Sequence, residues 1–313
     1  VGNPMAITNG RKPVAYYPLG DYSAFNGTEY LVPNSAQANI YSRYALSFDG
    51  VSGNKIDVGT IASLNSVTEF TVSFWSNFDS GQINDGVIFT NRVDNNNRIV
   101  IYRYNTSIYF HVNSSGSNQG NVTAPPIGSW THIAMVYDGS GLANTDRLKV
   151  YYNGVEQTLS YGGIIPATTG TYSTSYISAR GDGSNEYKGD LSNVSIWSAG
   201  LTSAQVTEIY NEGKPSNLNN HSAYSNLISW WQLGENSSFN TNWTVLNEIS
   251  TGPNGVSANM TEADLVNGVG QTASGVSSGM GGADNIIGDA PYSTANAVSY
   301  GMGVDALSTS VPS

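Results

Sequence analysis

Cysteine is absent from the sequence, and its absence excludes several kinds of organisation. A scaffold held by disulfides cannot form, and neither can a metal site built from thiolate ligands. A catalytic cysteine is excluded for the same reason. At 313 residues the chain can still bury a full hydrophobic core, so the lack of disulfides is compatible with an exposed protein.

Charge is also scarce, and basic side chains are the scarcest. Asp, Glu, Lys and Arg together make up 11% of the residues, and the formal net charge is −11. Lys214 is the last basic residue, so residues 215–313 carry carboxylates alone. Such a balance repels phosphate backbones and anionic membranes. We therefore expect no nucleic-acid partner.

Long apolar runs are missing as well. No window holds the roughly 18 apolar residues of a membrane helix, and no signal-peptide core is visible. With 35 glycines and 20 tyrosines, the chain relies on neutral polar groups for solubility, as proteins outside cells commonly do. We expect an extracellular or otherwise exposed location and no membrane insertion.

The residues that are present favour short strands. Arg98–Tyr104 and Ser107–Val112 alternate apolar and polar side chains, which predicts two half-buried strands. Turn-forming clusters such as Asp94–Asn97 separate these runs. The only convincing helix lies near Ala204, with Thr202 as its N-cap. This punctuation is typical of an antiparallel sandwich.

Five segments carry a family resemblance, and they occur in the order that the family requires. They are Ala45–Val51, Glu69–Trp75, Gly128–Gly139, Leu148–Gly154 and Tyr176–Tyr210. Together they resemble the laminin-G-like domains of the concanavalin-A-like lectin/glucanase family. The resemblance implies an all-β, two-sheet antiparallel jelly-roll sandwich with one short helix near its end, followed by an irregular C-terminal extension.

An internal repeat lies outside this pattern. Residues 15–35 align without gaps on residues 229–249, at a constant offset of 214. The matching pairs are Leu19/Leu233, Gly20/Gly234, Ser23/Ser237, Phe25/Phe239 and Asn26/Asn240. The second copy contains Trp230 and Trp231, which cost free energy if water surrounds them. We expect this strand to pair with the first domain's sheet or with another subunit.

These features predict four parts of the chain. Residues 1–13 form an N-terminal arm, residues 14–213 the jelly roll and residues 214–226 a linker. Residues 227–313 start a partial second repeat and continue as an acidic extension rich in Gly, Ser and Ala.

The extension carries a second resemblance. Its "WWQLGE" opening and its last residues, 305–312, resemble segments of laminin-G-like surface proteins on the virions of tailed phages. This resemblance implies a capsid decoration or appendage protein on a virion surface. Its partners would be other virion or surface proteins, bound through residues 215–313.

Catalytic patterns are not found. Glucanases of the resembled family place glutamates and an aspartate together along one strand, whereas the glutamates of this chain occur singly. A Ser-His-Asp triad would need His111, His132 or His221. The resemblance implies that His132 is a core residue, and His221 lies in the predicted linker. We therefore predict that the protein is not an enzyme.

One strand pair offers a candidate binding face. If the aliphatic residues of both strands form the core, then Tyr102, Tyr104, Tyr109 and His111 share the solvent-facing side. Aromatic faces beside polar groups suit glycans, so this set is a candidate carbohydrate- or partner-binding site. The alternative is that these tyrosines simply fill half-buried strands or face a protein neighbour.

Calcium is the expected cofactor, as one structural ion. The resemblance implies that Asp49 helps to hold it, and Asp182 and Asp190 are the other candidate ligands. Ser192 stands where the family usually has a second aspartate, which weakens this prediction. Alternatively, Asp49 caps the turn after Phe48.

The sequence thus predicts a noncatalytic virion surface structural or decoration protein with lectin-like binding to a glycan or host surface. One alternative is a secreted or cell-surface bacterial carbohydrate-binding module. A degenerate glycoside hydrolase is the third interpretation.

Overall fold

The computed structural model describes residues 42–269 except 52, 82–84 and 115, together with the backbone of residues 24–25 and 30–31. The chain divides into two units, of which residues 39–270 form one and residues 1–38 with 271–313 form the other. No helix in the described part is both long and apolar enough to span a membrane. The predicted arm, residues 1–13, lies outside the described residues.

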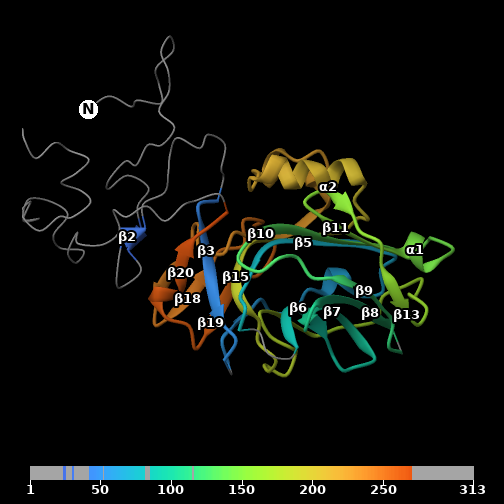
Figure 1. Ribbon diagram of the computed structural model, residues 1–313, viewed down its shortest axis with the longest axis horizontal. Coiled ribbons are helices and arrows are strands. Elements are labelled where there is room, and N and C mark those ends of the chain that lie inside the picture. Colours follow the sequence, from blue (N-terminus) through green and yellow to red (C-terminus); the bar gives the residue numbers. More distant parts are fainter. Residues whose placement is uncertain are drawn as a thin grey trace, which may run out of the picture. The chain divides into compact units, whose positions relative to one another are not determined.

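The larger unit contains two sheets whose neighbouring strands pair antiparallel, as predicted (Figure 1). The first sheet runs in the order β12 (Val155–Glu156), β11 (Leu148–Tyr152), β10 (Trp130–Asp138), β5 (Glu69–Phe78), β15 (Lys188–Trp197), β3 (Tyr44–Asp49) and β20 (Leu265–Asn267), with β16 (Leu227–Trp231) also paired to β15. The second sheet runs in the order β13 (Ser160–Gly162), β9 (Gln119–Thr123), β8 (Ser107–Ser114), β7 (Asn97–Tyr104), β6 (Gly86–Arg92), β14 (Thr174–Ile177), β4 (Lys55–Asp57), β19 (Gly255–Ala258), β18 (Asn242–Val245) and β17 (Ser238–Asn240).

Alternation along the strands builds the main core. In β7 and β8 the fully buried side chains include Ile99, Ile101, Ile108, Phe110 and Val112, as the sequence predicts. From the first sheet, Phe70, Val72 and Phe74 of β5 are equally buried. Burying a side chain of this size contributes roughly 1.5–3 kcal/mol to stability. The two sheets therefore form a jelly-roll sandwich around one apolar interior.

Helix α2 (Ser203–Tyr210) begins where the sequence predicts. The Thr202 side chain accepts a hydrogen bond from the backbone N–H of Gln205, whose side chain accepts one in return from the N–H of Thr202. This reciprocal capping box fixes the start of the helix. Asn211, in the left-handed conformation (φ 46°), ends it.

Shorter helical segments complete the secondary structure. A one-turn helix, α1 (Asn144–Arg147), connects β10 to β11. The described residues also contain five 3-10 turns, which are Ala62–Leu64, Asn211–Gly213, Leu218–Asn220, Tyr224–Asn226 and Glu262–Asp264.

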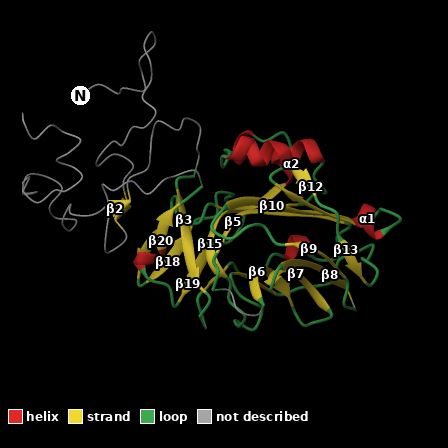
Figure 2. Cartoon of the chain, in the orientation of Figure 1, coloured by secondary structure: helices red, strands yellow, loops and turns green. Residues whose placement is uncertain are grey.

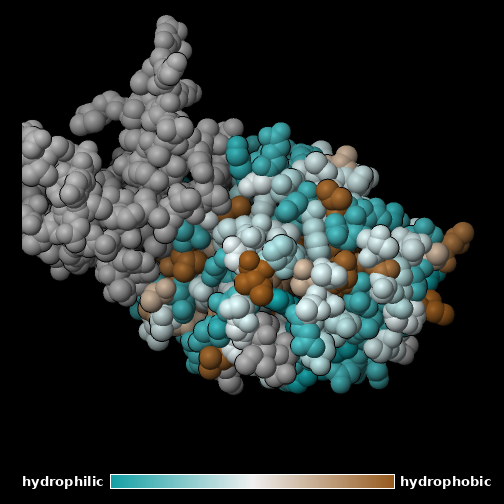
Figure 3. All heavy atoms as spheres, viewed as in Figure 1, coloured by the Kyte–Doolittle hydropathy of each residue, from teal (hydrophilic) through white to brown (hydrophobic). Residues whose placement is uncertain are grey.

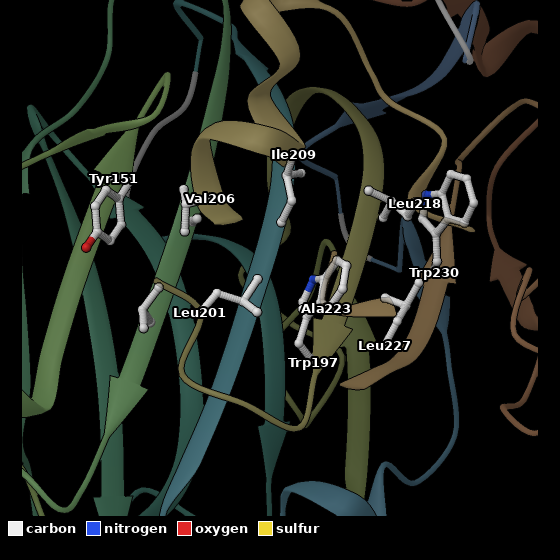
Figure 4. Close-up of a cluster of buried hydrophobic side chains, with 11 residues drawn as sticks. Tyr151, Trp197, Leu201, Val206, Ile209, Leu218, Ala223, Leu227 and Trp230 are labelled. Carbon is white, nitrogen blue, oxygen red and sulfur yellow. The ribbon is translucent and has the colours of Figure 1, made fainter. Parts of the chain in front are cut away.

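Helix α2 covers the far face of the first sheet and creates a second, smaller core (Figure 2). Val206 and Ile209 of the helix pack with Trp197 of β15 and Trp230 of β16 (Figure 4). Leu218 belongs to the same cluster, although residues 214–226 are predicted to be a linker. This segment is therefore packed against the sandwich.

Residues 227–267 supply strands to both sheets. Strand β16 pairs with β15, β20 pairs with β3, and β19 pairs with β4. Trp230 and Trp231 are fully buried, so the second copy of the repeat pairs with the first domain's sheet, one of the two expected outcomes. The acidic extension beyond residue 269 lies outside the described residues.

The repeat is also visible as two matching hairpins. In β1 (Ala24–Phe25) and β2 (Tyr30–Leu31), Phe25 is paired with Tyr30. In β17 and β18, Phe239 is paired with Trp243. The equivalent residues Phe25 and Phe239 are thus paired in both hairpins, and the first hairpin has one more residue between the paired positions than the second.

Strand β15 contains an irregularity near its middle. Its register against β5 shifts between Ser192 and Ser195, and Asn193 has φ 52°. The break in apolar alternation after Leu191 is therefore a β-bulge.

The described surface carries no large apolar patch on the face seen in Figure 3, where apolar side chains are scattered among hydrophilic ones. The most exposed large apolar residues, Leu142 and Ile164, lie in loops. Single exposed apolar residues of this kind are normal for a folded protein.

Candidate functional site

A pocket of about 360 Å³ lies at the end of the first sheet, where β3, β5 and β15 are neighbours. We call it the polar pocket. Its lining residues are Ser47, Phe48, Asp49, Asn77, Phe78, Asp79, Ser80, Ile127, Gly128, Lys188, Gly189 and Asp190.

Asp190 is the central polar group of this pocket. The register places it opposite Ser47 on one side and Asn77 on the other. Asn77 Nδ2 donates a hydrogen bond to Asp190 Oδ2 over 3.0 Å. Burial raises the pKa of the Asp190 carboxyl, while hydrogen bonds from Ser47 and Asn77 oppose the rise. The strands thus hold a carboxylate acceptor beside an amide donor.

A second polar pair lines the pocket. Lys188 Nζ lies 3.3 Å from Asp79 Oδ1, and the backbone N–H of Gly81 donates to the same oxygen over 2.6 Å. The hydrogen bond from Gly81 lowers the pKa of Asp79, against a smaller effect of desolvation. Asp79 therefore remains ionised and keeps the ammonium group of Lys188 at the pocket.

The three predicted calcium ligands do not meet at one point. Asp49 and Asp190 line the polar pocket, whereas Asp182 binds the guanidinium of Arg180 through contacts of 2.6 and 3.0 Å. This pairing lowers the pKa of Asp182. Within the described part of the chain, no three His, Cys, Asp or Glu side chains are grouped to hold a metal. The calcium ion stays a prediction that rests on Asp49 and Asp190.

The alternative role of Asp49 is present in the structure. Asp49 Oδ1 accepts a hydrogen bond of 2.8 Å from the backbone N–H of Val51, which caps the turn after β3. Ser192, at the family's aspartate position, is fully buried and bonds the carbonyl oxygens of Tyr44 and Gln232. A carboxylate at this position would face two acceptors, so serine suits the site.

The four residues of the predicted aromatic face have different exposures. Tyr104 is 43% exposed and Tyr102 and Tyr109 are half-buried, but His111 is only 2% exposed. The rings of Tyr102 and Tyr109 stack at 5.0 Å, with 9° between their planes. Tyr102 also stacks on His111 at 5.5 Å.

This stacking limits what the aromatic face offers a ligand. A sugar that packs on an aromatic residue needs a free ring face. Tyr102 uses its ring on Tyr109 and His111, so it presents its edge and its hydroxyl. Burial raises the pKa of Tyr102 to about 12, which keeps this hydroxyl protonated. The set is therefore better suited to hydrogen bonding than to stacking.

Two histidines that a triad would need have structural contacts. His132 is fully buried, and its Nε2 lies 2.7 Å from Ser73 Oγ. His221 accepts a hydrogen bond at Nδ1 from the N–H of Ala223, so its Nε2 donates to the carbonyl of Gln205. Its ring packs on Trp197 at 4.6 Å. The placement of His221 in a linker is thus corrected, because the residue is part of the core beneath α2.

Buried histidines make a pH dependence of stability predictable. Burial lowers the pKa from 6.5 to about 4 for His111, aided by Arg98, and to about 3 for His132. Below pH 6.5 the unfolded chain binds protons that the native state rejects. The free energy of unfolding should therefore fall between pH 6.5 and 4, by about 1.4 kcal/mol per pH unit for each histidine.

Urea unfolding at pH 5, 6 and 7 measures this slope. The His111→Gln variant should show a clearly shallower slope than the parent protein, since one of the two groups no longer titrates. Equal slopes in both proteins would contradict the assignment to His111.

Comparisons with known proteins place the chain. Its residues 49–207 match the family described as the concanavalin A-like lectin/glucanases superfamily. No curated protein matches the chain.

Solved structures with a similar backbone fold include a heptameric SAP-like pentraxin from Limulus polyphemus, with a TM-score of 0.45. Its sequence is 16% identical, and the alignment covers 73% of this chain and 95% of the pentraxin chain. Another is a putative carbohydrate binding protein from Bacteroides ovatus, at 15% identity and a TM-score of 0.49, covering 80% and 69%. The family match spans about half of the sequence and coincides with the described sandwich. The chain therefore belongs to the concanavalin A-like lectin/glucanase superfamily.

Proposed function

We propose that this protein is a noncatalytic glycan-binding protein and that the polar pocket holds the sugar. The observation that carries the proposal is the hydrogen bond between Asp190 of β15 and Asn77 of the adjacent strand β5. Each hydroxyl of a sugar both donates and accepts hydrogen bonds, so it needs an acceptor beside a donor. Asp190 supplies the acceptor, and Asn77 and Lys188 supply donors.

The dimensions of the pocket support the same function. Its volume of about 360 Å³ falls within the roughly 300–1,000 Å³ of small-ligand sites. Gly128 and Gly189 line it beside the exposed apolar side chain of Ile127, which suits the carbon face of a sugar ring.

The carboxylates at the pocket argue for binding without hydrolysis. Hydrolysis of a glycoside needs one carboxyl as acid and a second as base or nucleophile. Asp49 is engaged in its turn, and Asp79 is paired with Lys188. Asp190 then lacks a second carboxylate that is free to act with it.

A glycan array followed by calorimetric titration of the strongest hit tests this proposal. Asp190→Ala should weaken binding about tenfold to a hundredfold, because a hydrogen bond to a charged group contributes about 1.5–3 kcal/mol. Leu142→Ala serves as the control and should bind normally, because Leu142 is exposed in a loop and does not line the pocket. A reducing-sugar assay on the bound glycan should stay at background. Unchanged affinity of Asp190→Ala would refute the assignment to the pocket.

The proposal also includes a location for the protein, the surface of a virion. The resemblance of the extension to phage surface proteins supports a virion surface, with neighbouring proteins bound through the part of residues 215–313 that follows the last strand of the sandwich, β20. Mass spectrometry of purified virions would test it.

Calcium is proposed with Asp49 as a ligand, and a chelator should then lower the melting temperature of the parent protein but not of Asp49→Ala.

A further inference from the structure

Two arginines lie directly opposite each other on the outer face of the second sheet. The register of β6 and β7 pairs Arg92 with Arg98. Like charges at directly opposed positions destabilise a sheet. This pairing is notable in a chain that has 12 basic residues and a net charge of −11.

The hydrogen bonds of the arginine pair go to neutral groups. Arg92 Nη2 and Arg98 Nη1 both donate to one neutral acceptor, Asn95 Oδ1, over 3.2 and 3.4 Å. In the described part of the chain, neither Arg92 nor Arg98 belongs to an ion pair within 4.0 Å. Burial lowers the pKa of both guanidinium groups, and Arg180 lowers it further, whereas Asp182 and Asp94 act in the opposite direction on Arg92 and Asp85 does so on Arg98.

Several donors around the pair have no partner in the described structure. Arg92 Nη1 and Arg98 Nε are buried and make no hydrogen bond. His111 Nδ1 lies 3.4 Å from Arg98 Nη2, and its Nε2 is also unpartnered, in a side chain that is 2% exposed. A buried donor that lacks a partner destabilises the folded state. An arrangement that keeps three such donors near two like charges suits an anion.

Neutral hydrogen-bonding groups continue from the arginine pair across the same face. Tyr102 stacks on His111, and Tyr109 lies opposite Asn121 of β9. Gln119 of β9 lies opposite His111. A ligand that spans β6 to β9 would therefore meet guanidinium groups at one end and hydroxyl and amide groups at the other.

We infer that the Arg92–Arg98 pair binds the oxyanion of an acidic saccharide, a carboxylate or a sulfate, whose neutral part lies along Tyr102 and Tyr109. Guanidinium groups bind such anions through two parallel hydrogen bonds. The ligand class deepens the proposed glycan binding, but the residues belong to the second sheet and not to the polar pocket.

Calorimetric titration of the full chain with three tetrasaccharides tests the inference. One probe is rich in carboxylates (a hyaluronan fragment), one is rich in sulfates (a carrageenan fragment), and cellotetraose is neutral. We expect at least one acidic probe to bind at least about tenfold more tightly than the neutral one, with affinity falling as salt increases. The stronger acidic probe identifies the anion. If all three probes bind with equal affinity, or if neither acidic probe binds, the inference is overturned by the parent protein alone.

Variants then assign the residues. R92Q/R98Q should lose the preference for the acidic probe, and R98K should show an intermediate loss because lysine cannot form two parallel bonds. Lys149→Gln removes one positive charge from the first sheet and should retain the preference.

Thermal unfolding separates a binding role from a structural one. R92Q/R98Q should melt at or above the temperature of the parent protein, since the opposed like charges are gone. A lower melting temperature with intact acidic binding would overturn the inference. Asp190→Ala reports on the polar pocket separately, so failure of either site can be recognised.

Discussion

Replacing Trp230 by alanine is expected to lower the free energy of unfolding by about 3–5 kcal/mol. The indole is fully buried beneath α2, beside Trp197 and Leu227 (Figure 4). Its Nε1 donates to Asn193 Oδ1 at the bulge of β15, and its backbone N–H donates to Asn247 Oδ1. The substitution therefore removes a core side chain and leaves a buried acceptor without its donor.

Chemical denaturation followed by circular dichroism measures this effect. Tyr224→Ala is the control, because Tyr224 is 44% exposed in the turn before the same strand and should cost little. Trp230→Phe should fall between the two, since it keeps most of the apolar volume. If Trp230→Ala and Tyr224→Ala shift the midpoint equally, residues 227–231 do not contribute to the sandwich as described.

The strands and the helix cap were predictable because their signals are local. Alternation of apolar and polar residues predicts β7 and β8. Thr202 and Gln205 carry the capping box within four residues. Each of these features depends on residues that are close in sequence.

The candidate sites were only partly predictable because they depend on strand register. Asp190, Asn77 and Ser47 are far apart in the sequence and meet only because β15 lies between β3 and β5. The opposition of Arg92 to Arg98 likewise follows from the pairing of β6 with β7. No local pattern in the sequence reveals which residues of distant strands become neighbours in a sheet.

Burial by distant elements explains the remaining differences. The polar, Asn-rich sequence of residues 214–226 suggests a linker, yet α2 and β16 give Leu218 and His221 an apolar cluster to join. His111 was expected on an exposed face. It is buried because neighbouring side chains, including Tyr102, pack over it.

Gly189→Ala is expected to destabilise the protein by about 2–4 kcal/mol and to weaken glycan binding as well. Gly189 has φ 137°, a conformation that a side chain rarely tolerates. A Cβ there would lie 2.4 Å from the carbonyl oxygen of Asn77 and 2.4 Å from the hydroxyl of Tyr187. That hydroxyl bonds both Ser76 Oγ and the Asn77 carbonyl, so relieving the clash breaks a buried network beside the pocket.

Gly128 provides the matched control at the same pocket. It also has a positive φ, 71°, but a Cβ there would meet nothing within 4 Å. Gly128→Ala should therefore cost only the conformational term, about 1 kcal/mol, and retain binding. Melting temperatures and titrations with the same glycan compare both variants with the parent protein. Equal losses would mean that backbone conformation alone governs both positions. A larger loss for Gly189→Ala in stability and in affinity would show that the Asn77–Tyr187 network supports the polar pocket, because only that variant disturbs it.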